Sequence, residues 1–176
     1  MKRVLLVGIV YVVIALGMDQ GFLPLFGEAS QRIHWSELRL LPVGIILFGC
    51  LCRDYESMLI AVLAAIPFGA VIGPGYVGSS MVSFTLAAYL SYWAARLFYL
   101  ESFIMRWLVI FGIAAAECWI WSIVHHAFWH ASPIEMQWQT LAVTGFIGAV
   151  LYRPVAFSLR YKKPPPEPIG RRKREA

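Results

Sequence analysis

The chain has 176 residues, of which 60% are hydrophobic and only 14% are charged, and its formal net charge is +5. Its mean hydropathy is +0.67, whereas a typical soluble domain is about 45–50% apolar and about 25% charged. This composition argues against a soluble domain and predicts an integral membrane protein whose excess apolar surface faces lipid. At this length we expect one compact bundle with short loops and no separate soluble domain.

Six apolar stretches approach the roughly 20 residues that an α-helix needs to cross a bilayer. They predict an all-α integral membrane fold, with a compact six-helix transmembrane bundle over residues 1–160. In chain order the stretches are 4–26, 38–52, 57–72, 77–98, 107–129 and 138–159. The first follows Lys2 and Arg3 as in a signal peptide, but no small-x-small cleavage site comes before Asp19, so we expect it to remain as a span.

The second and third stretches are shorter than a full crossing and are separated only by residues 53–56. Short helices can cross where the bilayer thins or where neighbouring helices surround them. We therefore expect two crossings, with a re-entrant hairpin as the alternative. The sequence Gly73-Pro74-Gly75 between the third and fourth stretches predicts a sharp reversal, because proline ends the helical ladder and glycine permits positive φ.

The basic residues divide unevenly between the two sides of the predicted bundle. With the N-terminus inside, thirteen lysines and arginines fall at or near the inner boundary, and only Arg32 and Arg39 fall outside. Because cytoplasmic loops carry the excess of basic residues, both termini are predicted to be cytoplasmic. Residues 161–176 are proline-rich and basic, and we expect a disordered cytoplasmic tail that attracts anionic lipid rather than nucleic acid.

Glu117 lies in the middle of the fifth stretch, near the centre of the predicted membrane. A carboxylate at that depth is costly and usually faces the bundle interior or a cavity. It can serve a proton relay, a substrate or a partner, or it can fix helix packing through a hydrogen bond or ion pair. Arg153 in the sixth stretch is its candidate partner, and snorkelling of Arg153 to the inner interface is the preferred alternative.

Three histidines, His125, His126 and His130, lie near the outer boundary of the fifth stretch. His126 and His130 are four residues apart, which suits two metal ligands on one helix face, and Glu117, Trp121 and His125 also share a face. No acidic residue accompanies the pair in the His-Glu-x-x-His manner. We therefore expect histidines at a membrane boundary, where their polar tips reach water, rather than a metal or haem site. No cofactor or catalytic set is expected.

Small residues recur at every fourth position of the fourth stretch, at Ser79, Ser83, Ala87, Ser91 and Ala95. They fall along one face of a helix, and small residues let two membrane helices approach closely. The pattern predicts a helix-packing face within the bundle, and the alternative is an interface with a partner protein.

The sequence resembles the rod shape-determining protein MreD family of bacteria in size, in the number of spans and in several short stretches. These are residues 39–42, the segment 68–78 with its glycine-rich turn, the pair Ala88-Tyr89 and the acidic residue Glu117. Two features depart from the family pattern. Ala70 stands where the family often has an aspartate, and the three-histidine segment is not typical of the family.

The resemblance implies a non-catalytic inner-membrane scaffold of the bacterial cell-elongation machinery, which controls rod shape and peptidoglycan synthesis. It implies binding to MreC, and through MreC to MreB, RodA and a class B penicillin-binding protein. The family fold is similar to the substrate-binding component of energy-coupling-factor vitamin transporters. Such a component is the first alternative, with an outer pocket lined by Trp35, Trp129, His130 and Trp138. A membrane enzyme or metal carrier that uses Glu117 and the histidines is the second.

Overall fold

The computed structural model describes residues 2–19, 40–52, 54–72, 76–129 and 138–159. Within these ranges the chain forms six helices and no strand, so the predicted all-α fold is confirmed. The helices are α1 (Lys2–Gly17), α3 (Leu40–Leu51), α4 (Asp54–Ile72), α5 (Val77–Leu97), α6 (Phe103–Trp129) and α7 (Trp138–Leu159). The predictions made for residues 20–39, for the Gly73-Pro74-Gly75 turn and for the tail 161–176 lie outside the described residues.

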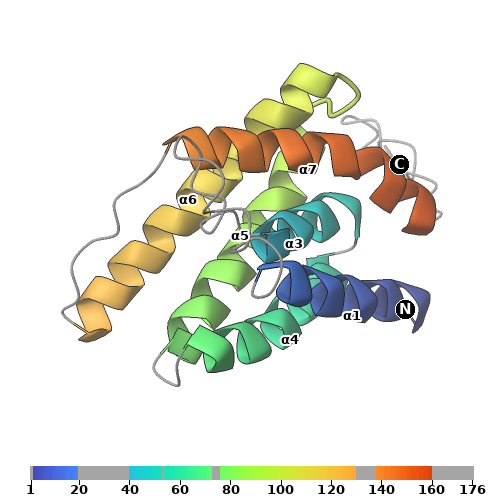
Figure 1. Ribbon diagram of the computed structural model, residues 1–176. Helices are drawn as coiled ribbons and strands as arrows, with labels where there is room; N and C mark the ends of the chain where they lie inside the picture. The colour runs from blue at the N-terminus through green and yellow to red at the C-terminus, as the bar shows by residue number, and fades with distance from the viewer. Residues whose placement is uncertain (1, 20–39, 53, 73–75, 130–137, 160–176) are drawn as a thin grey trace, which may run out of the picture.

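Helix α3 occupies the centre of the bundle. It contacts each of the other five described helices, and Figure 1 shows it in the middle of the view with α1, α4, α5 and α7 around it. Ten of its twelve residues are buried. A helix that is apolar on every face suits such a position, because it can be enclosed without burying a charge.

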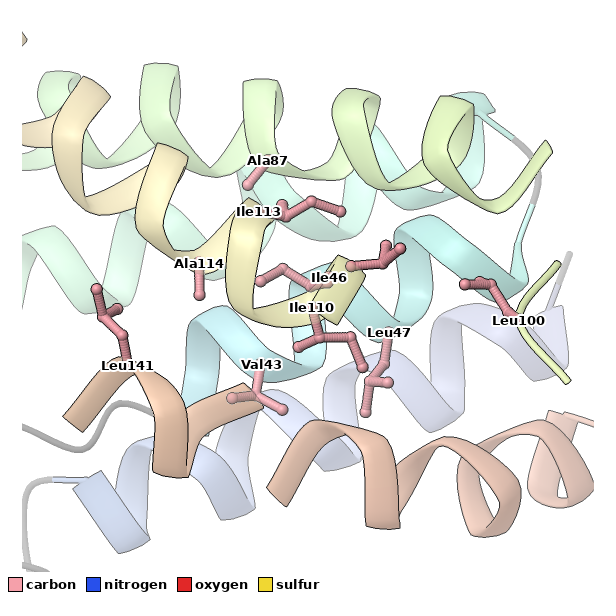
Figure 2. Close-up of a cluster of buried hydrophobic side chains, with 10 residues drawn as sticks. Val43, Ile46, Leu47, Ala87, Leu100, Ile110, Ile113, Ala114 and Leu141 are labelled. Carbon is pink, nitrogen blue, oxygen red and sulfur yellow. The ribbon is translucent and has the colours of Figure 1, made fainter. Parts of the chain in front are cut away.

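Buried apolar side chains form three clusters, and α3 contributes to all of them. The first cluster joins α3, α5, α6 and α7. Figure 2 shows Val43 and Leu47 of α3 beside Ile110 of α6, with Ala87 of α5 and Leu141 of α7 at the edges. The second cluster joins α1, α3, α4 and α5, and the third joins α1, α3, α4 and α7. The core is therefore organised around α3.

Helices α3 and α5 approach closely at Gly49. A Cβ atom on Gly49 would lie 2.5 Å from the Cβ of Ser91 and 2.7 Å from the backbone oxygen of Ala88, so only glycine fits. Beside it, the Cys50 thiol donates to the backbone oxygen of Ser91 at 3.6 Å. The Ser91 hydroxyl donates back to the backbone oxygen of Ala87 at 2.6 Å, so it adds no unsatisfied polar group to the contact.

Two helices begin earlier than the sequence predicts. α4 begins at Asp54, so residues 54–56, predicted to link two spans, belong to its first turn. α6 begins at Phe103 rather than at residue 107. The reason is a cap: the Ser102 hydroxyl oxygen accepts a hydrogen bond from the backbone N–H of Met105 at 3.3 Å, which satisfies one of the free N–H groups of the first turn.

Within the described residues, two helical segments are long and apolar enough, by length and composition alone, to cross a membrane. They are Phe103–Ala127 and Trp138–Leu159. Three further apolar helical segments, Val4–Gly17, Leu40–Leu51 and Tyr55–Val71, are shorter. The six predicted spans therefore correspond to six helices, and two of these meet the requirements of a span on their own.

Candidate functional site

Helix α6 turns the side chains of Glu117 and His125 into the bundle. Glu117, Trp121 and His125 follow one another at intervals of four residues and so lie on one face of the helix. Their side chains are only 3%, 5% and 8% exposed. Trp119 and His126, on other faces of the same helix, are exposed. The predicted shared face is therefore an interior one.

Tyr76, the residue that precedes α5, packs against this face. Its ring stacks on His125, with centroids 4.6 Å apart and an interplanar angle of 18°, and on Trp121, with centroids 5.9 Å apart and an angle of 16°. Trp121 and His125 are nearly parallel as well, with centroids 5.2 Å apart. The Ser79 hydroxyl donates to the backbone oxygen of Tyr76 at 3.0 Å and so helps to hold it in place. The three rings are called the aromatic stack below.

The aromatic stack contains a polar atom that can still bind. His125 Nδ1 is buried and has no hydrogen-bond partner within the part of the chain that the structure describes. An unsatisfied buried polar atom costs roughly 1–3 kcal/mol. A water molecule or a ligand atom at this position would remove that cost, so His125 is the candidate contact for a bound molecule.

Glu117 and His125 do not form a direct acid–base pair. They are eight residues apart on α6, which separates their backbones by about 12 Å along the helix axis, and Trp121 lies between them in the sequence of that face. A proton relay would therefore need further groups between the two side chains. The three rings of the aromatic stack are already paired with one another, and His125 Nδ1 remains an open contact for a bound group.

The other residues predicted for a polar site lie elsewhere. Arg153 is exposed on α7, whereas Glu117 is buried, so the two side chains occupy different environments. His130 lies outside the described residues. Over the described ranges, no group of three or more His, Cys, Asp or Glu side chains is arranged to hold a metal ion.

The small-residue face of α5 is largely internal. Ser79, Ser83, Ala87 and Ser91 are buried and Ala95 is half-buried. The Ser83 hydroxyl donates to the backbone oxygen of Ser80 at 3.3 Å, within the helix itself. Because this face also includes the close contact with Gly49 of α3, the structure favours helix packing over a partner interface for these residues.

Three functional or structural side chains were not predicted from the sequence. Tyr76 joins the aromatic stack, Asp19 is buried at the N-terminus of α3, and Arg106 is only 5% exposed. In the sequence, Asp19 resembles an interruption of a span and Arg106 resembles a boundary residue. The one local signal in the sequence is Ser102, because serine is a preferred residue immediately before the first turn of a helix.

Comparisons of the chain with models of known protein families, with curated proteins and with solved structures find no match.

Proposed function

We propose that the chain is a multi-pass inner-membrane protein with six crossings and two cytoplasmic termini, and that it is a non-catalytic scaffold of the bacterial cell-elongation machinery. In this role it would bind MreC, and through MreC it would connect to MreB, RodA and a class B penicillin-binding protein. The distribution of apolar side chains carries the membrane part of the proposal. The resemblance to the MreD family carries the choice of partners.

Large apolar side chains lie on the outside of every described helix except α3. Val13 of α1 is 65% exposed, Leu97 of α5 is 75% exposed and Phe157 of α7 is 84% exposed. The interior, in contrast, holds ionisable side chains such as Glu117 and Arg106 and several serines. Soluble monomers rarely expose contiguous apolar patches larger than a few hundred Å². An apolar exterior around a partly polar interior is the arrangement expected of a helical bundle in lipid.

Helix length is consistent with this proposal. At 1.5 Å per residue, the 27 residues of α6 extend about 40 Å and the 22 residues of α7 about 33 Å, and the hydrocarbon core is about 30 Å thick. α3 has only 12 residues. Neighbouring helices enclose α3, and a short helix can be accommodated where other helices surround it.

The segment that resembles the MreD family lies at a tight contact. Residues 68–78 cover the end of α4 and the beginning of α5. A Cβ atom on Gly69 would lie 2.5 Å from the Cα of Val77, so the glycine allows α4 and α5 to approach closely at this point. Ala70, where the family often has an aspartate, is exposed. The missing carboxylate therefore leaves no interior group of the bundle without a partner.

Affinity purification of the tagged chain from gently solubilised native membranes, followed by mass spectrometry, tests the proposal. Recovery of MreC together with RodA or an actin-like filament protein is expected. An untagged strain and an unrelated tagged multi-pass protein control for non-specific capture. Recovery of a paired ATPase with its transmembrane coupling subunit, and of no elongation protein, would contradict the scaffold.

Glu117→Gln separates a structural from a chemical role for the buried carboxyl group. A scaffold needs only the size and hydrogen-bonding capacity of this side chain, so we expect the variant to accumulate normally and to retain MreC. The matched control is Glu101→Gln, because Glu101 is an exposed acidic residue. Normal accumulation with complete loss of function would instead indicate that the carboxyl group takes part in proton transfer.

The aromatic stack favours a second candidate, the substrate-binding component of an energy-coupling-factor type vitamin transporter. Tyr76, Trp121 and His125 form an aromatic wall, and His125 Nδ1, which has no hydrogen-bond partner among the described residues, adds a polar contact for a small molecule bound beside it. A small aromatic molecule that copurifies with the protein in a one-to-one ratio, and is lost in His125→Ala, would support this candidate. A preparation without such a molecule would leave the scaffold as the better proposal.

A further inference from the structure

Arg106 is a charged side chain in an almost completely buried position. It lies in the first turn of α6 and is 5% exposed. Its guanidinium carbon lies 5.4 Å from the centroid of the Tyr152 ring on α7 and 5.9 Å from the centroid of the Phe103 ring. The ring faces offset part of the cost of burying the cation, but they supply no negative charge.

Most of the hydrogen-bonding capacity of Arg106 is unused. Its Nε–H donates to the backbone oxygen of Ser102 at 3.3 Å, and no carboxylate within the described ranges forms an ion pair with it. A guanidinium group has five N–H donors, so its two terminal nitrogens remain available. Neither terminal nitrogen is among the buried polar atoms that lack a hydrogen-bond partner, so both keep some access to solvent, where an anion can approach them. The position is therefore prepared for an anion.

The N-terminus of α6 adds further donors at the same place. The side chain of Arg106 reaches back to Ser102, the residue that precedes the helix. Ser102 caps the N–H of Met105, and within the described residues the N–H groups of Phe103 and Ile104 have no partner. Free N–H groups and the positive end of the helix dipole together favour a phosphate group.

We propose that Arg106 and the first turn of α6 bind a phosphate group, and that its source is an anionic phospholipid of the cytoplasmic leaflet. The choice of a lipid rests on the proposed membrane orientation, which places this end of α6 at the inner surface. Ile104, in the same turn of α6, is 66% exposed and would lie against the acyl chains. An arginine fork can bind two phosphate oxygens at once, which a lysine cannot do.

Glu101 gives the proposal a second, opposite test. It is an exposed acidic residue immediately before the cap, and it accepts a hydrogen bond from Tyr99 rather than pairing with Arg106. Its negative charge opposes binding of an anion. Glu101→Gln should therefore strengthen phosphate binding, whereas loss of Arg106 should weaken it.

The experiment uses the full-length protein, purified in detergent and stripped of lipid, and measures affinity by native mass spectrometry and by the shift in unfolding temperature. The probes are phosphatidylglycerol and inorganic phosphate. Arg106→Gln should weaken phosphatidylglycerol binding by at least about tenfold, because charged hydrogen bonds are lost. Arg96→Gln and Arg153→Gln remove the same charge from exposed positions and should change the affinity by less than about threefold.

Four outcomes decide the proposal. Lipid binding that depends on Arg106 and is strengthened by Glu101→Gln supports both the site and its lipid source. Equal Arg106-dependent binding of inorganic phosphate and lipid supports the phosphate site but overturns the lipid source, whatever the result with MreC. Equal weakening by all three arginine variants, or by none, overturns the site. If Arg106→Gln does not fold, Arg106→Lys with Glu101→Gln gives the same decision, because lysine keeps the charge and loses the fork.

Discussion

The carboxylate of Asp19 caps helix α3 across a gap of twenty residues in the chain. Asp19 Oδ1 accepts a hydrogen bond from the backbone N–H of Leu40 at 2.7 Å, and Oδ2 accepts one from Leu41 at 3.0 Å. Next to them, the Tyr11 hydroxyl donates to the backbone oxygen of Leu40 at 2.9 Å. The two free N–H groups at the start of the central helix are thereby satisfied, and the negative charge lies at the positive end of the helix dipole.

Asp19→Ala should destabilise the protein through loss of this cap. Removing a helix cap costs about 0.5–2 kcal/mol, and here two buried N–H groups lose their acceptors at once. We expect the upper end of that range as a lower unfolding temperature in detergent. Asp19→Asn keeps one acceptor oxygen and should lie between the alanine variant and the wild type. An unchanged unfolding temperature in Asp19→Ala would show that the cap does not contribute.

Gly49→Ala should destabilise the contact between α3 and α5. The added methyl group would meet the backbone oxygen of Ala88 as well as the side chain of Ser91, and backbone cannot move aside as a flexible side chain can. Overpacking of this kind costs about 1–3 kcal/mol. The measurement is thermal unfolding of the detergent-solubilised variant, with size-exclusion chromatography as a check of folding.

Gly112→Ala is the matched control for Gly49→Ala. Gly112 also lies inside a helix, but a Cβ atom there would have no heavy atom within 4 Å. Alanine favours the helix over glycine by about 0.8–1.0 kcal/mol, so this variant should be neutral or slightly stabilising. Equal effects of the two substitutions would contradict the close approach at Gly49.

His125→Ala and His126→Ala compare two adjacent histidines in opposite environments. His125 is buried in the aromatic stack, whereas His126 is exposed. Removing His125 eliminates two ring contacts, each worth about 0.5–1.5 kcal/mol, and leaves a cavity. We expect a clear loss of stability for His125→Ala, and a change within about 0.5 kcal/mol for the surface variant. Similar unfolding temperatures for the two variants would contradict the stack.

Tyr99 should ionise at a higher pH than an ordinary tyrosine. Its hydrogen bond to the Glu101 side chain raises the pKa of the phenol above the usual 10.0, with smaller contributions from burial and from the Glu101 charge. Because the pKa is raised in the folded state, the stabilisation is complete below the unfolded pKa and is lost as the pH rises through the folded pKa. Ultraviolet titration of the wild type against Glu101→Gln should show one tyrosine that titrates earlier in the variant. Superimposed curves would contradict the hydrogen bond.

The positions of the helices could be predicted because long apolar stretches have few alternatives to a helix at this composition. The helix starts were less predictable. In the sequence Arg106 resembles a membrane-boundary residue, yet its side chain is buried and its Nε–H donates to the backbone oxygen of Ser102, and α6 begins before it, at Phe103. The sequence predicts a loop at Asp54 and Glu56, but both lie in the first turn of α4, where acidic residues complement the helix dipole.

Only the part of the candidate site that lies on a single helix, α6, could be predicted from the sequence. Glu117, Trp121 and His125 share a face because of the helical repeat, and this follows from their spacing. Tyr76 reaches the same place through the packing of α5 on α6, more than forty residues away in sequence. The Asp19 cap is likewise a tertiary contact. Neither leaves a periodic signal in the sequence, so neither could be found without the structure.

The enclosure of α3 has a consequence for the order in which the protein is built. α3 is the second described helix to emerge during synthesis, but its neighbours include α5, α6 and α7, which emerge later. In the proposed membrane setting, α3 has no charged side chain, so it can remain in lipid until the later helices have inserted. The native surroundings of α3 are complete only when α7, the last helix, has docked. A chain that stops before residue 138 would therefore present to lipid, or to quality-control proteases, a helix that the finished protein never exposes.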